Sequence, residues 1–296
     1  MDKINLRKDA MDKKVADLAP ELINLRKEAV TQLEKYKLDD HYANVALVLD
    51  ISWSMQDQYR SGLMQVVAEK TLALATGFDD VGEVEVFLFG RYAYHVGSCN
   101  LTNYKDFLSN TLRKHPLENT TYYSDVVDLL RRFYFERYFQ NLPQLKPHSH
   151  EKKGFLQKLL SWGLSDRDMA YRVRKTQFNP DKQLIQAEKP TFVIFQTDGD
   201  AHDADKARLE FINSTYEPIF WFLLGLGNGP FRLLEEIDEG MPGALTDNAS
   251  HTVIRTLDEI CEDWLFDEIC KEYKDYPNTA RRLGLLPSST QPGLFS

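Results

Sequence analysis

Two short polar stretches, each directly after an apolar run, hold the side chains best suited to chemistry in this sequence. The run V-A-L-V-L ends in Asp50-x-Ser52-x-Ser54, and the run T-F-V-I-F-Q ends in Thr197-Asp198. Side chains alternate along an extended chain, so positions 50, 52 and 54 project to one side as the strand ends. Carboxylate and hydroxyl oxygens are the ligands that a small hard cation prefers. The two stretches therefore predict a divalent-cation site at the edge of a parallel sheet.

The elements that must position these side chains follow from the hydrophobic pattern. Apolar runs covered on both faces are typical of buried parallel strands, and they lie at 44–50, 84–89, 191–197 and 217–225, with further strands near 92–96 and 251–255. Helical periodicity places helices at 61–77, 102–112, from about Ser124, and at 230–239, 258–275 and 277–285. Strands separated by helices predict an α/β fold with a doubly wound, mostly parallel sheet. Such sheets bind ligands at the carboxyl ends of their strands, where both polar stretches lie.

A family resemblance adds to this interpretation. The segment D-I-S-W-S-M-x-x-x-Y-x-x-G resembles the metal-ion-dependent adhesion site (MIDAS) of von Willebrand factor A (vWA) domains, and T-D-G-D resembles their second acidic element. The sequence is most similar to the TerF-type vWA domains of tellurium-resistance and stress proteins, with copines more distant. Further matching stretches include A-P-E-L-I-N-L, G-E-V-E-V-F-L-F-G, P-I-F-W-F-L-L-G-L-G, T-D-N-A and L-F-D-E-I. The resemblance implies a vWA fold, which is Rossmann-like.

The resemblance also implies a set of metal ligands. A Mg²⁺ ion, with Mn²⁺ or Ca²⁺ as alternatives, would be held by five side chains: Asp50, Ser52, Ser54, Thr121 and Asp198. Thr120 is next to the expected threonine and is an alternative ligand. In the family, the second aspartate commonly acts through a water molecule. An Asp or Glu of a protein partner would supply the remaining ligand.

Two departures from the family pattern concern access to the site and the shape of its middle loop. Trp53 stands where the family usually has glycine, so a large aromatic ring would roof the metal or narrow what reaches it. Residues 117–119, Leu-Glu-Asn, replace a glycine-rich run, which leaves the conformation of that loop open. Three carboxylates are expected around the site. Asp57 is either an indirect contact or an acidic residue near a helix N-terminus, while Asp200 and Asp203 shape the loop, cap the next helix and make the rim negative.

Composition and charge limit the class of protein. Apolar residues make up 43% of 296 residues, which is enough for a substantial core in one large or two small domains. The net charge of −9 argues against bulk affinity for nucleic acid or anionic membranes. No stretch approaches 18 uncharged apolar residues, and the N-terminus lacks an apolar signal core. Three cysteines do not form a disulfide framework. We therefore expect a cytoplasmic protein that does not associate with membranes.

The expected domain organisation has four parts. Residues 1–40 form two amphipathic helices that pack on the body, 41–286 form the vWA domain, and 287–296 form a loose tail. Within the domain, 131–187 are longer than the family needs and carry 12 Lys/Arg against 5 Asp/Glu, a net charge of +7 that leaves −16 for the rest. We interpret this aromatic-rich stretch as a small helical insertion whose basic face docks on an acidic surface. The alternatives are a disordered loop and a single-stranded nucleic-acid site.

Enzymatic hypotheses find little support in the sequence. A phosphatase of the haloacid-dehalogenase type requires a second aspartate two residues after its nucleophile, and Ser52 stands there after Asp50. There is no phosphate-binding P-loop and no order of residues that indicates a Ser-His-Asp triad. His148 and His150 have a spacing that a transition metal could use, but no third ligand accompanies them. We expect a protein that is not an enzyme: a metal-dependent interaction scaffold, which the resemblance assigns to tellurite or general stress response. A nucleic-acid-associated factor and a metal-dependent phosphohydrolase are the alternatives.

Overall fold

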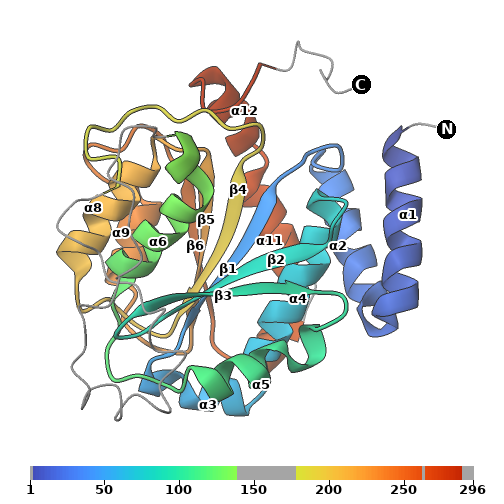
Figure 1. Ribbon diagram of the computed structural model, residues 1–296, viewed down its shortest axis with the longest axis horizontal. Coiled ribbons are helices and arrows are strands. Elements are labelled where there is room, and N and C mark those ends of the chain that lie inside the picture. Colours follow the sequence, from blue (N-terminus) through green and yellow to red (C-terminus); the bar gives the residue numbers. More distant parts are fainter. Residues whose placement is uncertain (1–2, 139–177, 262–263, 289–296) are drawn as a thin grey trace, which may run out of the picture.

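A six-stranded, mostly parallel sheet forms the centre of this computed structural model (Figure 1). The strands lie in the order β3-β2-β1-β4-β5-β6, and only β3 is antiparallel to its neighbour. Their bounds are β1 (Asn44–Asp50), β2 (Glu83–Phe89), β3 (Ala93–Asn100), β4 (Thr191–Thr197), β5 (Ile219–Leu226) and β6 (Ala249–Ile254). The structure describes residues 3–138, 178–261 and 264–288.

Helices cover both faces of the sheet, which confirms the predicted α/β class (Figure 1). Along β1, Val45, Leu47 and Leu49 belong to one core, while Ala46 and Val48 belong to the other. This division explains why the strand is apolar throughout. The helices of the body are α3 (Gln56–Arg60), α4 (Leu63–Phe78), α5 (Tyr104–Lys114), α6 (Tyr123–Phe135), α8 (Ala204–Ser214), α9 (Arg232–Asp238), α10 (Leu257–Cys261), α11 (Trp264–Tyr273) and α12 (Tyr276–Arg282).

Strand register brings the two polar stretches together. β1 pairs in parallel with β4, and Leu49 lies opposite Gln196, so Asp50 and Thr197 follow at the same edge. β2 flanks β1 on its other side, with Asp50 opposite Phe89. The carboxyl ends of the central strands therefore meet at one end of the sheet, as the sequence predicts.

The N-terminal helices α1 (Lys3–Leu18) and α2 (Ile23–Lys35), with a 3-10 turn at Pro20–Leu22 between them, pack on the body. Arg26 is buried, and its guanidinium donates to the carbonyl oxygen of Thr76 (2.7 Å) and pairs with Asp12 (2.7 Å). A Cβ on Gly77 would lie 2.4 Å from the Leu33 side chain, which shows how closely α2 approaches α4. These helices therefore share the core of the sheet.

Some element boundaries differ from the sequence prediction. The helix expected at 61–77 is α4, and the short helix α3, which the sequence did not predict, precedes it; Gly62, in a left-handed conformation (φ 84°), separates the two. The strand expected near 92–96 extends over β3 to Asn100 at the sheet edge. The helix expected at 258–275 corresponds to α10 and α11, which lie on either side of residues 262–263, outside the described residues. None of the described helices is long and apolar enough to cross a membrane.

The basic stretch 131–187 is only partly described, and its described ends belong to the body. Residues 131–135 are the end of α6, and Ile185 donates its N–H to the carbonyl oxygen of Tyr216 (3.0 Å). The predicted insertion began at residue 131 and ended at residue 187. The structure instead makes the described ends of this range part of the body. Residues 139–177, with His148 and His150, lie outside the described residues.

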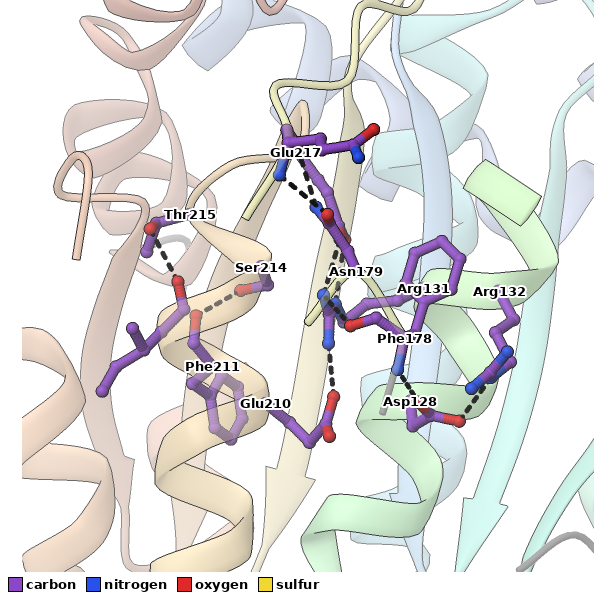
Figure 2. Close-up of polar contacts among 12 residues, drawn as sticks. Asp128, Arg131, Arg132, Phe178, Asn179, Glu210, Phe211, Ser214, Thr215 and Glu217 are labelled. Carbon is purple, nitrogen blue, oxygen red and sulfur yellow. Dashed lines mark hydrogen bonds and ion pairs between the residues drawn. The ribbon is translucent and has the colours of Figure 1, made fainter. Parts of the chain in front are cut away.

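A buried ionic cluster ties α6 to α8 and to the start of β5 (Figure 2). The guanidinium of Arg131 is fully buried and contacts Glu217 through two hydrogen bonds of 2.9 and 2.6 Å. It also pairs with Glu210 and donates to the carbonyl oxygen of Phe178 (3.3 Å). Asp128 accepts the N–H of Phe178 (3.2 Å). Both main-chain polar groups of Phe178 are therefore bonded to side chains of α6.

Candidate metal centre

Hydrogen bonds join four of the five predicted ligands. The N–H of Ser52 donates to Oδ1 of Asp50 (2.7 Å), and the hydroxyls of Ser52 and Ser54 lie 3.0 Å apart. Ser54 in turn donates to Oδ1 of Asp198 (2.9 Å). The ends of β1 and β4 thus bring two carboxylates and two hydroxyls to one place.

Asp50 is a fully buried carboxyl group whose hydrogen-bond donors are Ser52 and Thr197. Burial raises its pKa to about 7, although Thr197 donates a hydrogen bond to Oδ2 (2.7 Å) and Ser52 also donates to the carboxylate. Burial also raises the pKa of Asp198. Within the described chain, neither carboxylate pairs with Lys, Arg or His. An unpaired buried carboxylate is costly, so this geometry fits a bound cation.

The donor set indicates which kind of cation fits. Every donor is an oxygen atom, which suits Mg²⁺, Mn²⁺ or Ca²⁺ better than a soft metal. Among the described residues, no group of three or more His, Cys, Asp and Glu could hold a metal, so the hydroxyls are indispensable here. Ser54 is exposed, which leaves the site open on its side.

Thr121 lies beside this group on the loop that precedes α6. Its N–H donates to Nδ1 of His202 (3.2 Å), and its carbonyl oxygen accepts the N–H of His202 (2.9 Å). Among the described residues, its hydroxyl makes no hydrogen bond, and neither does the buried hydroxyl of Thr120. Both threonines therefore keep a hydroxyl available, and the structure does not join either of them directly to Asp50.

Glu118 sets the loop that lacks the family's glycines. Its N–H donates to the carbonyl oxygen of Ile51 (2.7 Å), and its own carbonyl accepts the N–H of Trp53 (2.8 Å). Its carboxylate accepts the hydroxyl of Tyr94 (2.7 Å). Gly90 leaves room for that carboxylate, because a Cβ there would lie 2.8 Å from it. The loop thus has no glycine to give it flexibility, and the Glu118 carboxylate fixes it by bonding to the neighbouring hairpin.

Trp53 and Asp57 both face solvent at the rim. The Trp53 side chain is 53% exposed, and the hydrogen bond to Glu118 holds only its main chain. Asp57 is exposed in the first turn of α3, and within the described residues its side chain contacts none of the candidate ligands. Tyr59, one half-turn later, donates instead to the carbonyl oxygen of Asp50 (2.9 Å).

The acidic loop after β4 holds neighbouring helices. Asp200 accepts the N–H of Leu233 near the start of α9 (3.1 Å). Asp203 accepts the N–H groups of Tyr123 (2.9 Å) and Ser124 (3.1 Å) at the start of α6. The prediction that Asp203 caps the next helix is therefore wrong for its side chain, because α8 has no side-chain cap. The unpaired N–H groups of α6 attract the carboxylate instead.

Sequence reasoning missed the roles of several residues that shape the site. His202 and Glu118 hold the threonine loop, and Thr197 donates to Asp50. Gly229 permits the close approach of the loop after β5, because a Cβ there would lie 1.9 Å from the carbonyl oxygen of Asp198. A signal existed only for Thr197, which ends a strand beside Asp198, and for the G-N-G-P turn that contains Gly229.

A groove of about 700 Å³ opens beside the threonine loop. The first turns of α6 and α8 line it, together with Arg91, Tyr122 and His202. Tyr122, next to Thr121, and His202, which bonds to Thr121, place this recess beside the threonine loop.

Known proteins resemble the chain over most of its length. An uncharacterized protein of Bacillus subtilis (strain 168), YcbR, is 27% identical over 271 residues, which cover 91% of this chain and 92% of that protein. Proximal thread matrix protein 1 from the mussel byssus aligns with a TM-score of 0.47 and 16% identity over 78% of this chain and 47% of that one, about half its length. A second structure of that mussel protein, with a zinc-occupied MIDAS motif, has a TM-score of 0.46, 16% identity and coverages of 80% and 48%.

The ArnB paralog VWA2 from Sulfolobus acidocaldarius has a TM-score of 0.38 and 11% identity over 74% of this chain and 43% of that one. The family description that matches is vWA-TerF-like, the vWA domain found in the TerF C terminus, and it covers residues 42–286. This match confirms the resemblance given by the strand-end motifs, and the chain belongs to the vWA-TerF-like family.

Proposed function

We propose that this protein is a metal-dependent protein-interaction module, in which a divalent cation at the strand ends binds an Asp or Glu of a partner. The observation that carries the proposal is the buried carboxylate of Asp50, which accepts the N–H of Ser52, while the hydroxyls of Ser52 and Ser54 continue the chain of hydrogen bonds to Asp198. In the described chain, no cationic side chain pairs with either carboxylate. A cation would supply the missing positive charge.

The residues that would hold the ion are Asp50, Ser52, Ser54, Thr121 and Asp198. Mg²⁺ is the proposed metal, with Mn²⁺ and Ca²⁺ as alternatives, because all donors are hard oxygens. Three of the five protein ligands would be uncharged hydroxyls, which favours a further carboxylate from outside. When bound, the ion would act as the point of attachment for that carboxylate. The groove beside the site offers space for neighbouring residues of the partner.

We propose binding and not catalysis because the carboxylates and hydroxyls of the site already hydrogen-bond to one another. Ser52 follows Asp50 at the position where a phosphatase of the haloacid-dehalogenase type needs an acid. A cytoplasmic location is proposed from the sequence composition, and the family resemblance is the sole support for a role in tellurite or general stress response, as a scaffold within a complex.

Calorimetric titration of Mg²⁺, Mn²⁺ and Ca²⁺ tests the metal site. We expect saturable binding by the intact protein, loss of binding in Asp50→Ala, and unchanged binding in Asp57→Ala, which removes an exposed carboxylate outside the hydrogen-bonded group. Equal binding by the intact protein and Asp50→Ala would refute the site.

A peptide titration tests the partner chemistry. Short peptides with one central Asp, or Asn at the same position, are added with and without Mg²⁺ while tryptophan fluorescence is followed. Trp53 is exposed at the rim, so its emission should change only with the Asp peptide and metal together. The matched control is Trp53→Phe, which should lose the signal. A change in fluorescence that is the same without Mg²⁺, or the same with the Asn peptide, would contradict the proposal.

A further inference from the structure

The loop after β4 contacts the threonine loop through a pair of hydrogen bonds that involve one residue on each side. Both main-chain polar groups of Thr121 bond to His202: the N–H donates to Nδ1 (3.2 Å), and the carbonyl accepts the His202 N–H (2.9 Å). His202 follows Asp198 by four residues. One loop thus carries one candidate ligand and holds another.

This pair of bonds fixes the direction of the Thr121 side chain. Rotation about either main-chain dihedral angle of Thr121 would break one of the two bonds, so its Cα–Cβ vector is set relative to the loop after β4. The next residue reinforces the contact, because Asp203 accepts the N–H groups of Tyr123 (2.9 Å) and Ser124 (3.1 Å).

The position of His202 indicates that it holds the threonine loop and does not contribute to the core. Its side chain is exposed while Thr121 is buried, so removing the imidazole leaves the core packing intact. Nδ1 accepts a hydrogen bond from a main-chain N–H and therefore carries no proton, which places the ring proton on Nε2. Only a side chain with an acceptor at the first atom beyond Cγ can reproduce this contact.

We propose that His202 is a positioning residue that holds Thr121 at the metal centre. The inference rests on the proposed function, since it takes Thr121 as a ligand of the cation. Partners that orient metal ligands from outside the coordination shell typically change metal affinity about 10–100-fold when they are removed.

Metal titration of His202 variants tests the proposal. We expect His202→Ala to bind Mg²⁺ about 10–100-fold more weakly, while its unfolding midpoint in EDTA stays at the value of the intact protein. His202→Asn should restore most of the affinity, because Oδ1 of Asn occupies the same place beyond Cγ as Nδ1. His202→Gln should not, because its oxygen lies one bond further out. His251→Ala, which removes an imidazole on β6, controls for loss of a histidine elsewhere.

A double-mutant cycle shows whether His202 acts through Thr121. If it does, Thr121→Val alone weakens binding, and adding His202→Ala weakens it no further. Additive losses, an unaffected His202→Ala, or an Asn variant as weak as Ala would each overturn the inference and leave the metal site standing. Absence of Mg²⁺ binding by the intact protein would instead overturn the proposed function and this inference with it.

Discussion

At the scale of single residues, Asp50 dominates the energetics of the site. It is the most deeply buried of the candidate ligands, and burial raises its pKa to about 7. Hydrogen bonds from Thr197 and Ser52 only partly offset the loss of hydration. The metal-free protein therefore holds this carboxyl group at an energetic cost that a cation would remove.

The first prediction follows from that raised pKa. In EDTA, the unfolded chain loses the Asp50 proton near 3.8, while the folded chain keeps it until about 7. Between these values the folded state binds one more proton, so the free energy of unfolding falls as pH rises, by up to about 4 kcal/mol. Asp50→Asn should lack this decline. Thermal melts at pH 5, 6 and 7 measure the difference.

Added Mg²⁺ provides the second half of that experiment. At pH 7 it should stabilise the intact protein and leave Asp50→Asn unchanged, because only the former gains a cation at the site. Parallel pH profiles for the two proteins in EDTA would show that Asp50 keeps an ordinary pKa.

A second prediction concerns the glycines around Asp198. A Cβ on Gly229 would lie 1.9 Å from the carbonyl oxygen of Asp198, whereas a Cβ on Gly199 meets nothing within 4 Å. Gly229→Ala should therefore displace the Asp198 loop, destabilise the protein by about 1–3 kcal/mol and weaken Mg²⁺ binding. Gly199→Ala, next to Asp198 itself, is the matched control. Urea unfolding and calorimetry would contradict the prediction if both variants behaved alike.

The meeting of the Asp50 and Asp198 stretches was predictable from local pattern, whereas Thr121 was placed with them by the family resemblance. Asp50 and Asp198 each end an apolar strand, and parallel strands bring such ends together. The supporting roles were not predictable. Asp203 caps α6 from the loop that precedes α8, and Glu118 bonds to a hairpin formed far earlier in the chain. Such contacts depend on neighbours that only the folded structure brings close.

At the scale of elements, the buried ionic cluster fixes α6 and α8 to one another (Figure 2). Three carboxyl groups, Asp128, Glu210 and Glu217, surround two arginines in a place without solvent. Burial raises the pKa of Glu210 to about 8, so one carboxyl keeps its proton near neutral pH. The cluster thus holds together α6, which follows the threonine loop, and α8, which follows the Asp198 loop.

The third prediction separates the members of that cluster. Arg131→Met leaves Glu217 buried without its partner and should cost about 3–5 kcal/mol. Glu210→Gln should cost less than about 1 kcal/mol at pH 7, because Gln resembles the protonated acid. The intact protein should lose stability between about pH 5 and pH 8 relative to Glu210→Gln, since the unfolded acid releases its proton near 4.5.

Urea unfolding at several pH values checks both variants. Equal losses for Arg131→Met and Glu210→Gln would mean that Glu210 is ionised in the fold. The cluster itself could not be read from the sequence, because Arg131 lies in the basic stretch that we interpreted as a helical insertion with a docking face. Its actual partners are 79 and 86 residues away.

At the scale of the whole molecule, the N-terminal helices belong to the same core as the sheet. The family match begins at residue 42, yet Met11, Val15, Leu22 and Leu33 are all buried against the body. Each buried aliphatic side chain contributes about 1.5–3 kcal/mol. Together they approach the 5–15 kcal/mol that stabilises a typical domain.

The fourth prediction is that a chain beginning at residue 41 is severely destabilised. We expect the full chain to unfold in one transition by circular dichroism, and the shortened chain to melt far lower or to aggregate. Removal of 289–296, which lie within the loose tail predicted over 287–296, is the control and should leave the midpoint unchanged. A shortened chain that melts within a few degrees of the full one would show that the helices are an appendage.

The strand order has a consequence for synthesis. β1 lies between β2 and β4, but β4 is made long after the other two. At 5–20 residues per second, a ribosome releases Asp198 about 7–30 s after Asp50. During that interval one edge of β1 has no partner, which is the kind of surface that aggregates. A nascent chain therefore lacks the ligand Asp198 until β4 has been synthesised. Until then, Ser52 and Ser54 follow a strand with one unpaired edge.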